Sequence, residues 1–373
     1  VGTNILGYGN PEVDEAVKQV ISMGNMSTLN APEEVFLAER LLEINPWAGG
    51  VRFARSGGEA NAIAVRIARA MSGKEGVAVC GYHGWHDWYL SANLGADDSL
   101  AGHLLPGLST AGVPSSLRGG VHPFDYNDFE NLVQLVTSKN IGVIKMEVMR
   151  TVEPADNFLL KVRRLCDEHN IVLVFDECTS GFRETFGGLH IKYGVRPDIA
   201  VFGKTLGNGY AVSAVVGRSD VMQMAQMTFI SSTFWTERIG SAAGLKTLEV
   251  MEQQQPWNTI TEIGKKVRTV WQNLSDHYEL KISIGGLPAI STFSFQGPDA
   301  IKYKTFITQE MLKKGFLAGT AFYACTKHTD QILEQYKNKL DPIFEKIKEC
   351  EKNKDIDMHL DGEPCHVGFK RLN

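Results

Sequence analysis

The sequence lacks three features that would each assign the chain to a particular class of protein. It has no dense run of Lys or Arg, and its formal net charge is −5, which argues against binding to nucleic acid or anionic lipid. No stretch reaches the roughly 18 apolar residues that a membrane helix needs. Residues 1–20 also lack the basic start and apolar middle of a signal peptide. We therefore expect a small-molecule partner, with no nucleic acid and no membrane.

Cysteines are few for the length of the chain, and none forms a C-x-x-C pair. The six cysteines are spread along the sequence, so neither a disulfide framework nor a Cys-rich metal site is indicated. Reduced thiols of this kind fit a cytoplasmic protein. His83 and His86 are candidate metal ligands, but no third ligand stands at a suitable spacing. We therefore expect no metal site.

The composition that is present is that of an ordinary globular protein. Apolar residues make up 43% and charged residues 22% of the 373 positions. A chain of this length can bury a sizeable core, and length alone predicts about two domains.

Apolar runs of strand length alternate with helical patterns through the first two thirds of the chain. The runs at residues 141–148, 171–175 and 199–202 have the composition of strands that are buried on both faces. Strands of this kind, alternating with helices, predict an α/β fold with a mostly parallel sheet.

The pattern changes after residue 251. Pro256 interrupts a helical stretch, and a helix, an alternating strand at residues 289–295 and two more helices follow. This order predicts a smaller α+β domain at the C-terminal end. We expect an N-terminal segment at residues 1–33, a large domain at 34–252 and a C-terminal domain at 253–373.

Charged side chains stand at the ends of two of the predicted strands. Asp176 and Glu177 directly follow the run at 171–175, and Lys204 stands two positions after the run at 199–202. Ligands of open α/β sheets bind beyond the carboxyl ends of the strands, so a site is expected there. A poorly solvated lysine has a lowered pKa, which favours imine formation with an aldehyde. The alternative for the two carboxylates is a helix cap or an ion pair.

A glycine turn at Ser56, Gly57 and Gly58 opens an amphipathic helical run. Backbone N–H groups and the helix dipole at such a start can bind a phosphate group. The two glycines do not complete the dinucleotide motif G-x-G-x-x-G. The GK[ST] ending around Lys204 is not a P-loop either, because Asp198 stands where that motif requires glycine.

Several motifs together resemble the class III aminotransferases, and within them the glutamate-1-semialdehyde aminomutase branch. Their order and spacing match, and the similarity extends from about residue 7 to about residue 348. The motifs are Ser56-Gly-Gly-Glu-Ala60, Gly81-Tyr-His-Gly-Trp85, Phe175-Asp-Glu177 with Gly181-Phe-Arg183, Pro197-Asp198 and Gly203-Lys204.

The resemblance implies a pyridoxal-phosphate transferase of fold type I, whose homodimer shares two active sites. It assigns catalysis to Lys204, as the Schiff-base lysine and proton shuttle, and to Asp176, as the partner of the pyridinium nitrogen. It implies that Tyr82 stacks on the cofactor ring. The further cofactor-binding residues that it implies are Ser56, Gly57, Gly58, His83, Glu147 and Cys178, with Thr233 from the other subunit.

Three positions depart from the pattern of this family. The family usually has Ser or Thr at the position of Gly58, and Val or Ile at the position of Cys178. A strand-end glutamate followed by proline is usual, whereas Val148 follows Glu147 here. These departures bear on substrate preference more than on cofactor binding.

The resemblance implies transfer of an amino group from a donor, for which glutamate is common, to an aldehyde or ketone acceptor. An intramolecular 2,1-aminomutase, a racemase and a cofactor-binding protein without catalysis stay open as alternatives. Trp85, His86, Asn30 and Trp235 are candidates for the substrate pocket, although aromatic residues at such places are as often core packing.

Overall fold

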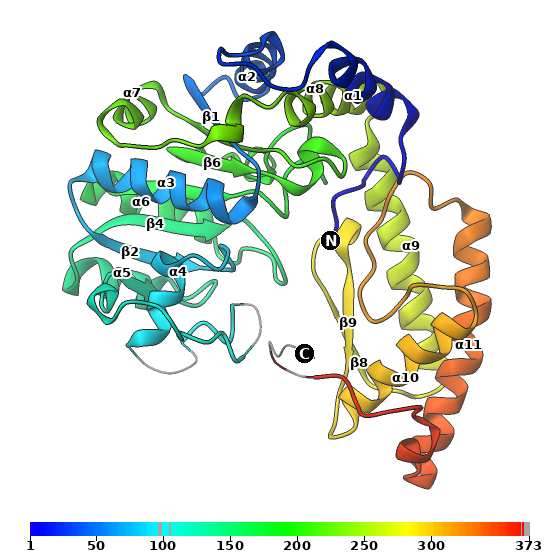
Figure 1. Cartoon of the computed structure of the whole chain (residues 1–373). Coiled ribbons are helices and arrows are strands. Elements are labelled where there is room, and N and C mark those ends of the chain that lie inside the picture. Colours follow the sequence, from blue (N-terminus) through cyan, green and yellow to red (C-terminus); the bar gives the residue numbers. More distant parts are fainter. Residues whose placement is uncertain (96–98, 104–105, 367, 369–373) are drawn as a thin grey trace. The chain divides into compact units, whose positions relative to one another are not determined.

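The computed structural model describes residues 1–95, 99–103, 106–366 and 368, and it divides into two units, Val1–Gln255 and Pro256–Asn373 (Figure 1). The N-terminal segment expected at residues 1–33 lies within the first unit. Its separate role and the domain boundary at residue 253 stay predictions. Among the helices of the described residues, none combines the length and apolar character needed to cross a membrane.

One sheet of seven strands organises the first unit. Its strands are β1 (Gly50–Ala54), β2 (Gly76–Cys80), β3 (Val121–Pro123), β4 (Ile141–Glu147), β5 (Val172–Asp176), β6 (Ile199–Phe202) and β7 (Ser213–Gly217). They are ordered β1-β7-β6-β5-β4-β2-β3, with β7 antiparallel to both of its neighbours and the other pairs parallel. The prediction of an α/β fold with a mostly parallel sheet is therefore confirmed.

Helices bury both faces of this sheet. The helices of the first unit are α1 (Pro11–Met23), α2 (Pro32–Ile44), α3 (Gly57–Ser72), α4 (Asp87–Leu90), α5 (Phe129–Ser138), α6 (Phe158–His169), α7 (Ser219–Gln223) and α8 (Arg238–Gln254). Val172 and Val174 of β5 share a core cluster with residues of α3. Because side chains alternate along a strand, Leu173 and Phe175 point to the opposite face, where they are also fully buried.

Helix α3 has clear signals at both of its ends. The Ser56 hydroxyl accepts the backbone N–H of Glu59, and the Glu59 carboxylate accepts the backbone N–H of Arg55. This arrangement resembles a capping box, except that the glutamate accepts from Arg55, the residue before the N-cap Ser56. At the other end Gly73 adopts a left-handed conformation with φ of 67°, which glycine tolerates without strain. The sequence therefore fixes where the helix starts and places its free N–H groups at Gly57 and Gly58.

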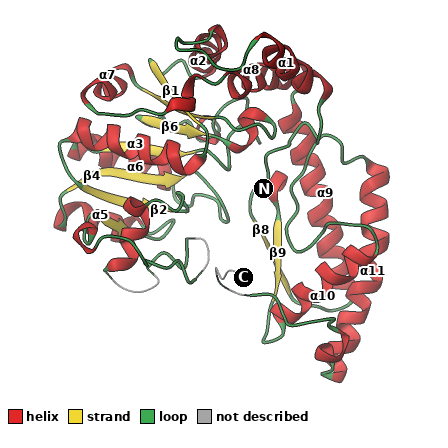
Figure 2. Ribbon diagram, in the orientation of Figure 1, coloured by secondary structure: helices red, strands yellow, loops and turns green. Residues whose placement is uncertain are grey.

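The second unit is mostly helical, with a pair of antiparallel strands (Figure 2). Its elements are α9 (Pro256–His277), β8 (Ile282–Gly285), β9 (Thr292–Phe295), α10 (Ala300–Lys313) and α11 (Asp330–Asn353). The strand predicted at residues 289–295 is wrong in its first half, because Pro288–Ile290 forms a turn of 3₁₀ helix. Proline has a fixed φ that suits the start of such a turn, and the strand begins beyond it, at Thr292.

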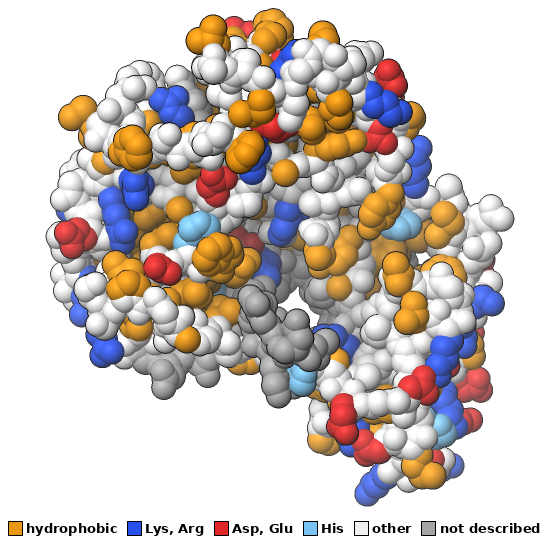
Figure 3. All heavy atoms as spheres, in the orientation of Figure 1, with side chains coloured by type: hydrophobic (Ala, Val, Ile, Leu, Met, Phe, Trp, Pro, Cys, Tyr) orange, Lys and Arg blue, Asp and Glu red, His pale blue; other side chains and the backbone are white. Residues whose placement is uncertain are grey.

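Charged side chains of both signs are interspersed over the face of each unit that Figure 3 shows. Such a surface has no extended field of a single sign on that face. This distribution agrees with the composition and with a small-molecule partner.

Candidate active site

The candidate site is built at the carboxyl ends of four neighbouring strands. Strands β6, β5, β4 and β2 lie side by side and run parallel, so the residues that end or follow them meet at one edge of the sheet. Glu147 pairs directly with Asp176 in the register of β4 and β5. Lys204 follows β6, and Tyr82 and His83 follow β2. The structure thus brings together the residues that the sequence singled out at the strand ends.

Asp176 is buried and held by hydrogen bonds from three directions. Its Oδ2 atom lies 2.8 Å from His83 Nδ1 and accepts Asn61 Nδ2 at 2.7 Å. Its Oδ1 atom accepts the backbone N–H of Cys178 at 3.0 Å. Burial alone would raise the pKa of this carboxyl, but the Lys145 charge and the His83 hydrogen bond outweigh burial and hold the pKa well below its usual range. Asp176 is therefore a fixed anion.

The partner imidazole stays uncharged at neutral pH. His83 is fully buried, and desolvation lowers its pKa to about 4, against the opposing effect of the Asp176 hydrogen bond. A carboxylate can only accept, so a neutral His83 donates its Nδ1 proton to Asp176. This hydrogen bond orients the carboxylate without neutralising its charge.

Lys204 stands at a turn that directs its amine over the strand ends. It begins a 3₁₀ segment, Lys204–Gly207, after Gly203, and its Nζ atom donates to Thr179 Oγ1 at 2.6 Å. Desolvation of the ammonium lowers the pKa of Lys204 and outweighs the attraction of nearby acidic groups, among them Glu147 and Asp176. The side chain remains open to solvent, so the desolvation is partial. The lowered pKa increases the fraction of free amine, and the exposure leaves the Nζ atom within reach of a ligand.

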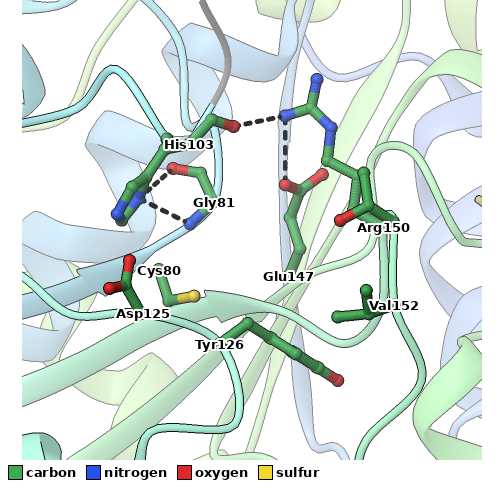
Figure 4. A pocket seen from close by; sticks show the side chains of 10 residues that line it. Cys80, Gly81, His103, Asp125, Tyr126, Glu147, Arg150 and Val152 are labelled. Carbon is green, nitrogen blue, oxygen red and sulfur yellow. Dashed lines mark hydrogen bonds and ion pairs between the residues drawn. The ribbon is translucent and has the colours of Figure 1, made fainter. Parts of the chain in front are cut away.

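Glu147 joins a second set of contacts at the same edge. Its Oε2 atom accepts the backbone N–H of Tyr82 at 3.2 Å and Arg150 Nη1 at 3.3 Å, and burial raises its pKa. Arg150 Nη1 also donates to the carbonyl of His103 at 3.0 Å. Glu147, Arg150 and His103 line a pocket of about 80 Å³ together with Tyr126. Figure 4 shows how these four residues lie around it. The Arg150 guanidinium offers this pocket a cation.

A cradle of small residues lies beside the anion. A Cβ atom on Gly57 would lie 3.2 Å from Cys178 Sγ, and one on Gly203 would lie 3.1 Å from the same sulfur. Cys178 therefore fills the space between the start of α3 and the Lys204 turn. A Cβ atom on Gly58 would lie 3.0 Å from the His86 ring, so glycine in place of the usual Ser or Thr makes room for that imidazole.

The remaining candidates are exposed at the surface or, for Trp235, packed against the hydrophobic core. Trp85 is 71% exposed and stacks on His86 with ring centroids 4.7 Å apart. Trp235 packs against the core, and its indole N–H donates to Glu59 Oε1 at 2.8 Å, which favours packing over substrate binding. Asn30 and Thr233 are exposed. Asp176 and its hydrogen-bond partners His83, Asn61 and Cys178 form what we call the Asp176 cluster. Within the described part of the chain, neither Asn30 nor Thr233 forms a hydrogen bond with this cluster.

Sequence reasoning missed four residues that the structure places here: Asn61, Lys145, Arg150 and Thr179. Lys145 had a usable signal, since it is a lysine inside the apolar run of β4, and Asn61 had one as a polar residue on the buried face of the amphipathic α3. Glu177 has a structural role: its carboxylate accepts the backbone N–H of His190 at 2.9 Å and lies 2.9 Å from that ring.

Comparison with known proteins matches one family model and finds relatives in sequence and in fold. The family model "Aminotransferase class-III" matches residues 1–350. A 3-aminobutyryl-CoA aminotransferase of Cloacimonas acidaminovorans is 30% identical over 89% of this chain and 80% of its own. A glutamate-1-semialdehyde 2,1-aminomutase of Hyperthermus butylicus is 28% identical, over 93% and 86%. The solved FumI protein of Sphingopyxis sp. MTA144, in a form that carries pyridoxal phosphate, shares the fold with a TM-score of 0.84 at 23% identity, over 94% and 84%.

Proposed function

Because this chain belongs to the class III aminotransferases, we propose that it moves an amino group from glutamate, as donor, to an aldehyde or ketone acceptor. Pyridoxal 5'-phosphate is its cofactor. When bound, this cofactor accepts the electron pair that is left when the Cα–H bond of an amine substrate breaks. The acceptor is a small molecule, and its identity is the open part of the proposal.

The observation that carries this proposal is the placement of Asp176 and Lys204 at the ends of adjacent strands. A fixed carboxylate at the end of β5 and a partly desolvated amine after β6 match the two polar ends of a pyridoxal ring. Glycine at positions 57 and 203 lets the start of α3 and the Lys204 turn lie close together, with Cys178 packed between them. These residues fit the cofactor.

Each residue would then have a distinct task. The free N–H groups of Gly57 and Gly58, at the start of α3, would bind the phosphate. Asp176 would hold the ring nitrogen through Oδ1, because Oδ2 is occupied by His83 and Asn61. Tyr82 would lie against the ring.

Lys204 would carry the cofactor and act as the acid and base of the reaction. Its lowered pKa would allow the amine to take the proton from the substrate Cα and to deliver it to C4' of the cofactor, a step worth about 10²–10⁴-fold in rate. Thr179 Oγ1 holds Nζ when the amine is not engaged and so limits its freedom. Lys204 is therefore the residue on which turnover depends.

We further propose that the chain acts as a homodimer in the cytoplasm, with Thr233 reaching the partner's phosphate site. Support comes from the segment around Thr233, in which Met227, Phe229 and Phe234 are exposed. Exposed apolar side chains that gather in one segment are typical of an interface. Arg55 fixes this segment by donating to the carbonyl of Phe234.

A second candidate is an intramolecular 2,1-aminomutase, which the similarity to the Hyperthermus butylicus enzyme favours. The two candidates differ in their need for a second substrate. A transaminase stops after one half-reaction when no acceptor is present, whereas a mutase completes its cycle on one substrate. A racemase would likewise turn over a single amine.

The test is a half-reaction with the cofactor-loaded enzyme. We expect L-glutamate alone to yield one equivalent of 2-oxoglutarate per subunit and then to stop, and a carbonyl acceptor to restart the release. Lys204→Ala should release none. Repeated turnover of glutamate-1-semialdehyde without any acceptor would instead establish the mutase, and failure of the wild-type enzyme with every amine offered would contradict both.

A further inference from the structure

A lysine lies inside the central sheet, in the strand next to the one that carries Asp176. Lys145 belongs to β4, whose seven residues are all buried, and it is completely inaccessible to solvent. Among the described residues its Nζ atom has no hydrogen-bond partner. A buried cation without compensation is strongly unfavourable, so this lysine requires a physical reason for its place.

The orientation of Lys145 supplies that reason. Side chains two apart on a strand share a face, so Lys145 and Glu147 point to the same side of the sheet as Val174 and Asp176, their partners in the register. The Nζ atom lies 4.0 Å from Asp176 Oδ2. The lysine therefore reaches along the sheet toward the carboxylate that would hold the cofactor ring.

A second unpaired atom lies at the same carboxylate. Asn61 donates its Nδ2 to Asp176 Oδ2, and its Oδ1 atom is buried without a hydrogen-bond partner. An ammonium group is a donor and an amide oxygen an acceptor, so Lys145 and Asn61 leave unpaired atoms of complementary kind. Lys145 of β4 and Asn61 of α3 thus both bring a polar group to the Oδ2 atom of Asp176.

The other groups that face this cluster cannot supply the missing positive charge. His83 is neutral, because burial holds its pKa at about 4. Burial raises the pKa of Cys178 and of Glu147, which are acids in any case. Lys204 has a hydrogen bond to Thr179, and its amine would be bonded to the cofactor in the loaded enzyme. Burial lowers the pKa of Lys145, and the charge of Asp176, whose Oδ2 atom lies 4.0 Å from Nζ, opposes that shift. Lys145 is thus the remaining group that can supply a positive charge to Asp176.

We propose that Lys145 is the resident counter-ion of Asp176, and that it is a positioning residue that weakens the hold of the aspartate on the proton of the cofactor's ring nitrogen. The cofactor part of this inference rests on the proposed function. An aspartate whose charge is already matched attracts a second cation less, so the ring nitrogen loses its proton at lower pH than beside an uncompensated carboxylate. This tunes how strongly the site withdraws electrons from the substrate.

The ion pair itself is tested in the apoprotein, where no cofactor is needed. Thermal unfolding of the wild type, Lys145→Met, Asp176→Asn and the double variant forms a double-mutant cycle. We expect each single change to lower the midpoint by roughly 5 °C or more, because it leaves a buried charge unpaired. The double variant should lose clearly less than the sum of the two. Additive losses would overturn the ion pair.

The effect on the cofactor is tested by ¹⁵N NMR of the holoenzyme loaded with cofactor labelled at the ring nitrogen. In the wild type, which needs no substitution to fold, we expect the signal to move from the protonated to the unprotonated position between about pH 6 and about pH 9. Lys145→Met should move this midpoint up by about one pH unit or more.

Three results would count against the inference in different ways. A ring nitrogen that stays protonated throughout in the wild type, or a midpoint that Lys145→Met does not move, would overturn the role toward the cofactor. A protein that binds no cofactor would overturn the proposed function and that role together, while the apoprotein cycle would still decide the ion pair.

Discussion

The Asp176 cluster and the segment around Thr233 differ in what they bury: the cluster buries polar groups that are hydrogen-bonded, whereas the segment leaves apolar side chains exposed. In the cluster, hydrogen bonds within one chain fix a buried carboxylate from three sides. In the segment, Phe229 and Phe234 are 87% and 62% exposed, and Arg55 donates to the carbonyl of Phe234. The cluster is preorganised by hydrogen bonds within the first unit, whereas the segment offers exposed apolar side chains to the dimer interface that is proposed above.

This difference separates two kinds of expected effect. Changes in the cluster should alter chemistry, cofactor affinity and pH dependence at any protein concentration. Changes in the segment should act through assembly, and so should depend on concentration.

The largest effect is expected at the catalytic amine. Lys204→Ala should lower kcat by about 10³-fold or more, because it removes the group that moves the proton. The measurement is steady-state turnover with saturating donor and acceptor. Lys139→Ala, at an exposed lysine before β4, is the matched control and should retain activity. If kcat of the Lys204→Ala enzyme lay within tenfold of the wild-type value, Lys204 would not be the group that moves the proton.

The next effect is on the pH dependence of stability. Because burial holds the folded pKa of His83 at about 4, below its usual 6.5, the unfolded chain binds a proton in that window and the folded chain does not. The contribution of neutral His83 to the free energy of unfolding is complete above about pH 6.5 and is lost as the pH falls through 4. Its size is on the order of 3 kcal/mol.

This loss is measured by urea unfolding at several pH values. His83→Gln should flatten the fall in unfolding free energy between pH 6.5 and 4, whereas His169→Gln, at an exposed histidine, should leave it unchanged. The same slope in the His83 variant as in the wild type would show that His83 is not held neutral by burial.

A smaller effect is expected in the cradle. The new methyl of Gly57→Ala would lie 3.2 Å from Cys178 Sγ, and we expect it to weaken cofactor binding about tenfold. Adding Cys178→Ala should restore most of the affinity. Gly95→Ala, whose Cβ atom would meet only ordinary contacts, is the control. A titration in which the second change gives no recovery would argue that the two residues do not share a site.

The smallest effect concerns assembly. Phe229→Ser should shift the population toward monomer by a few-fold in dissociation constant, because it removes apolar area from the proposed interface. Sedimentation velocity over a concentration series measures this shift. Leu317→Ser, at a residue exposed to 96% in the second unit, should have no effect. Equal dissociation constants for both variants would place the interface elsewhere.

The sequence was sufficient to predict a mostly parallel sheet and the charged residues that follow two of its strands. Buried parallel strands are continuous apolar runs, and their carboxyl ends meet by topology, which is why Asp176 and Lys204 could be grouped in advance. Glu147 was expected here only through the family resemblance. The strand predicted at residues 289–295 was wrong in its first half because an alternation of apolar and polar side chains does not reveal that Pro288–Ile290 forms a turn.

The contacts that tune the site were beyond sequence reasoning. Asn61 is distant in sequence from Asp176 and reaches it only because α3 packs on β5. Lys145 was read as part of an apolar run, since its neighbour across the sheet appears only in the register of β4 and β5. The reason for glycine at position 58 is likewise the His86 ring, which lies in a separate loop.

The most direct test of the central claim is the absorption spectrum of the purified protein reconstituted with pyridoxal phosphate, before and after L-glutamate is added without acceptor. We predict a band near ~420 nm that gives way to one near ~330 nm, as expected for a cofactor that is linked to Lys204 and then takes the amino group. A protein that shows no such band after reconstitution would contradict the account.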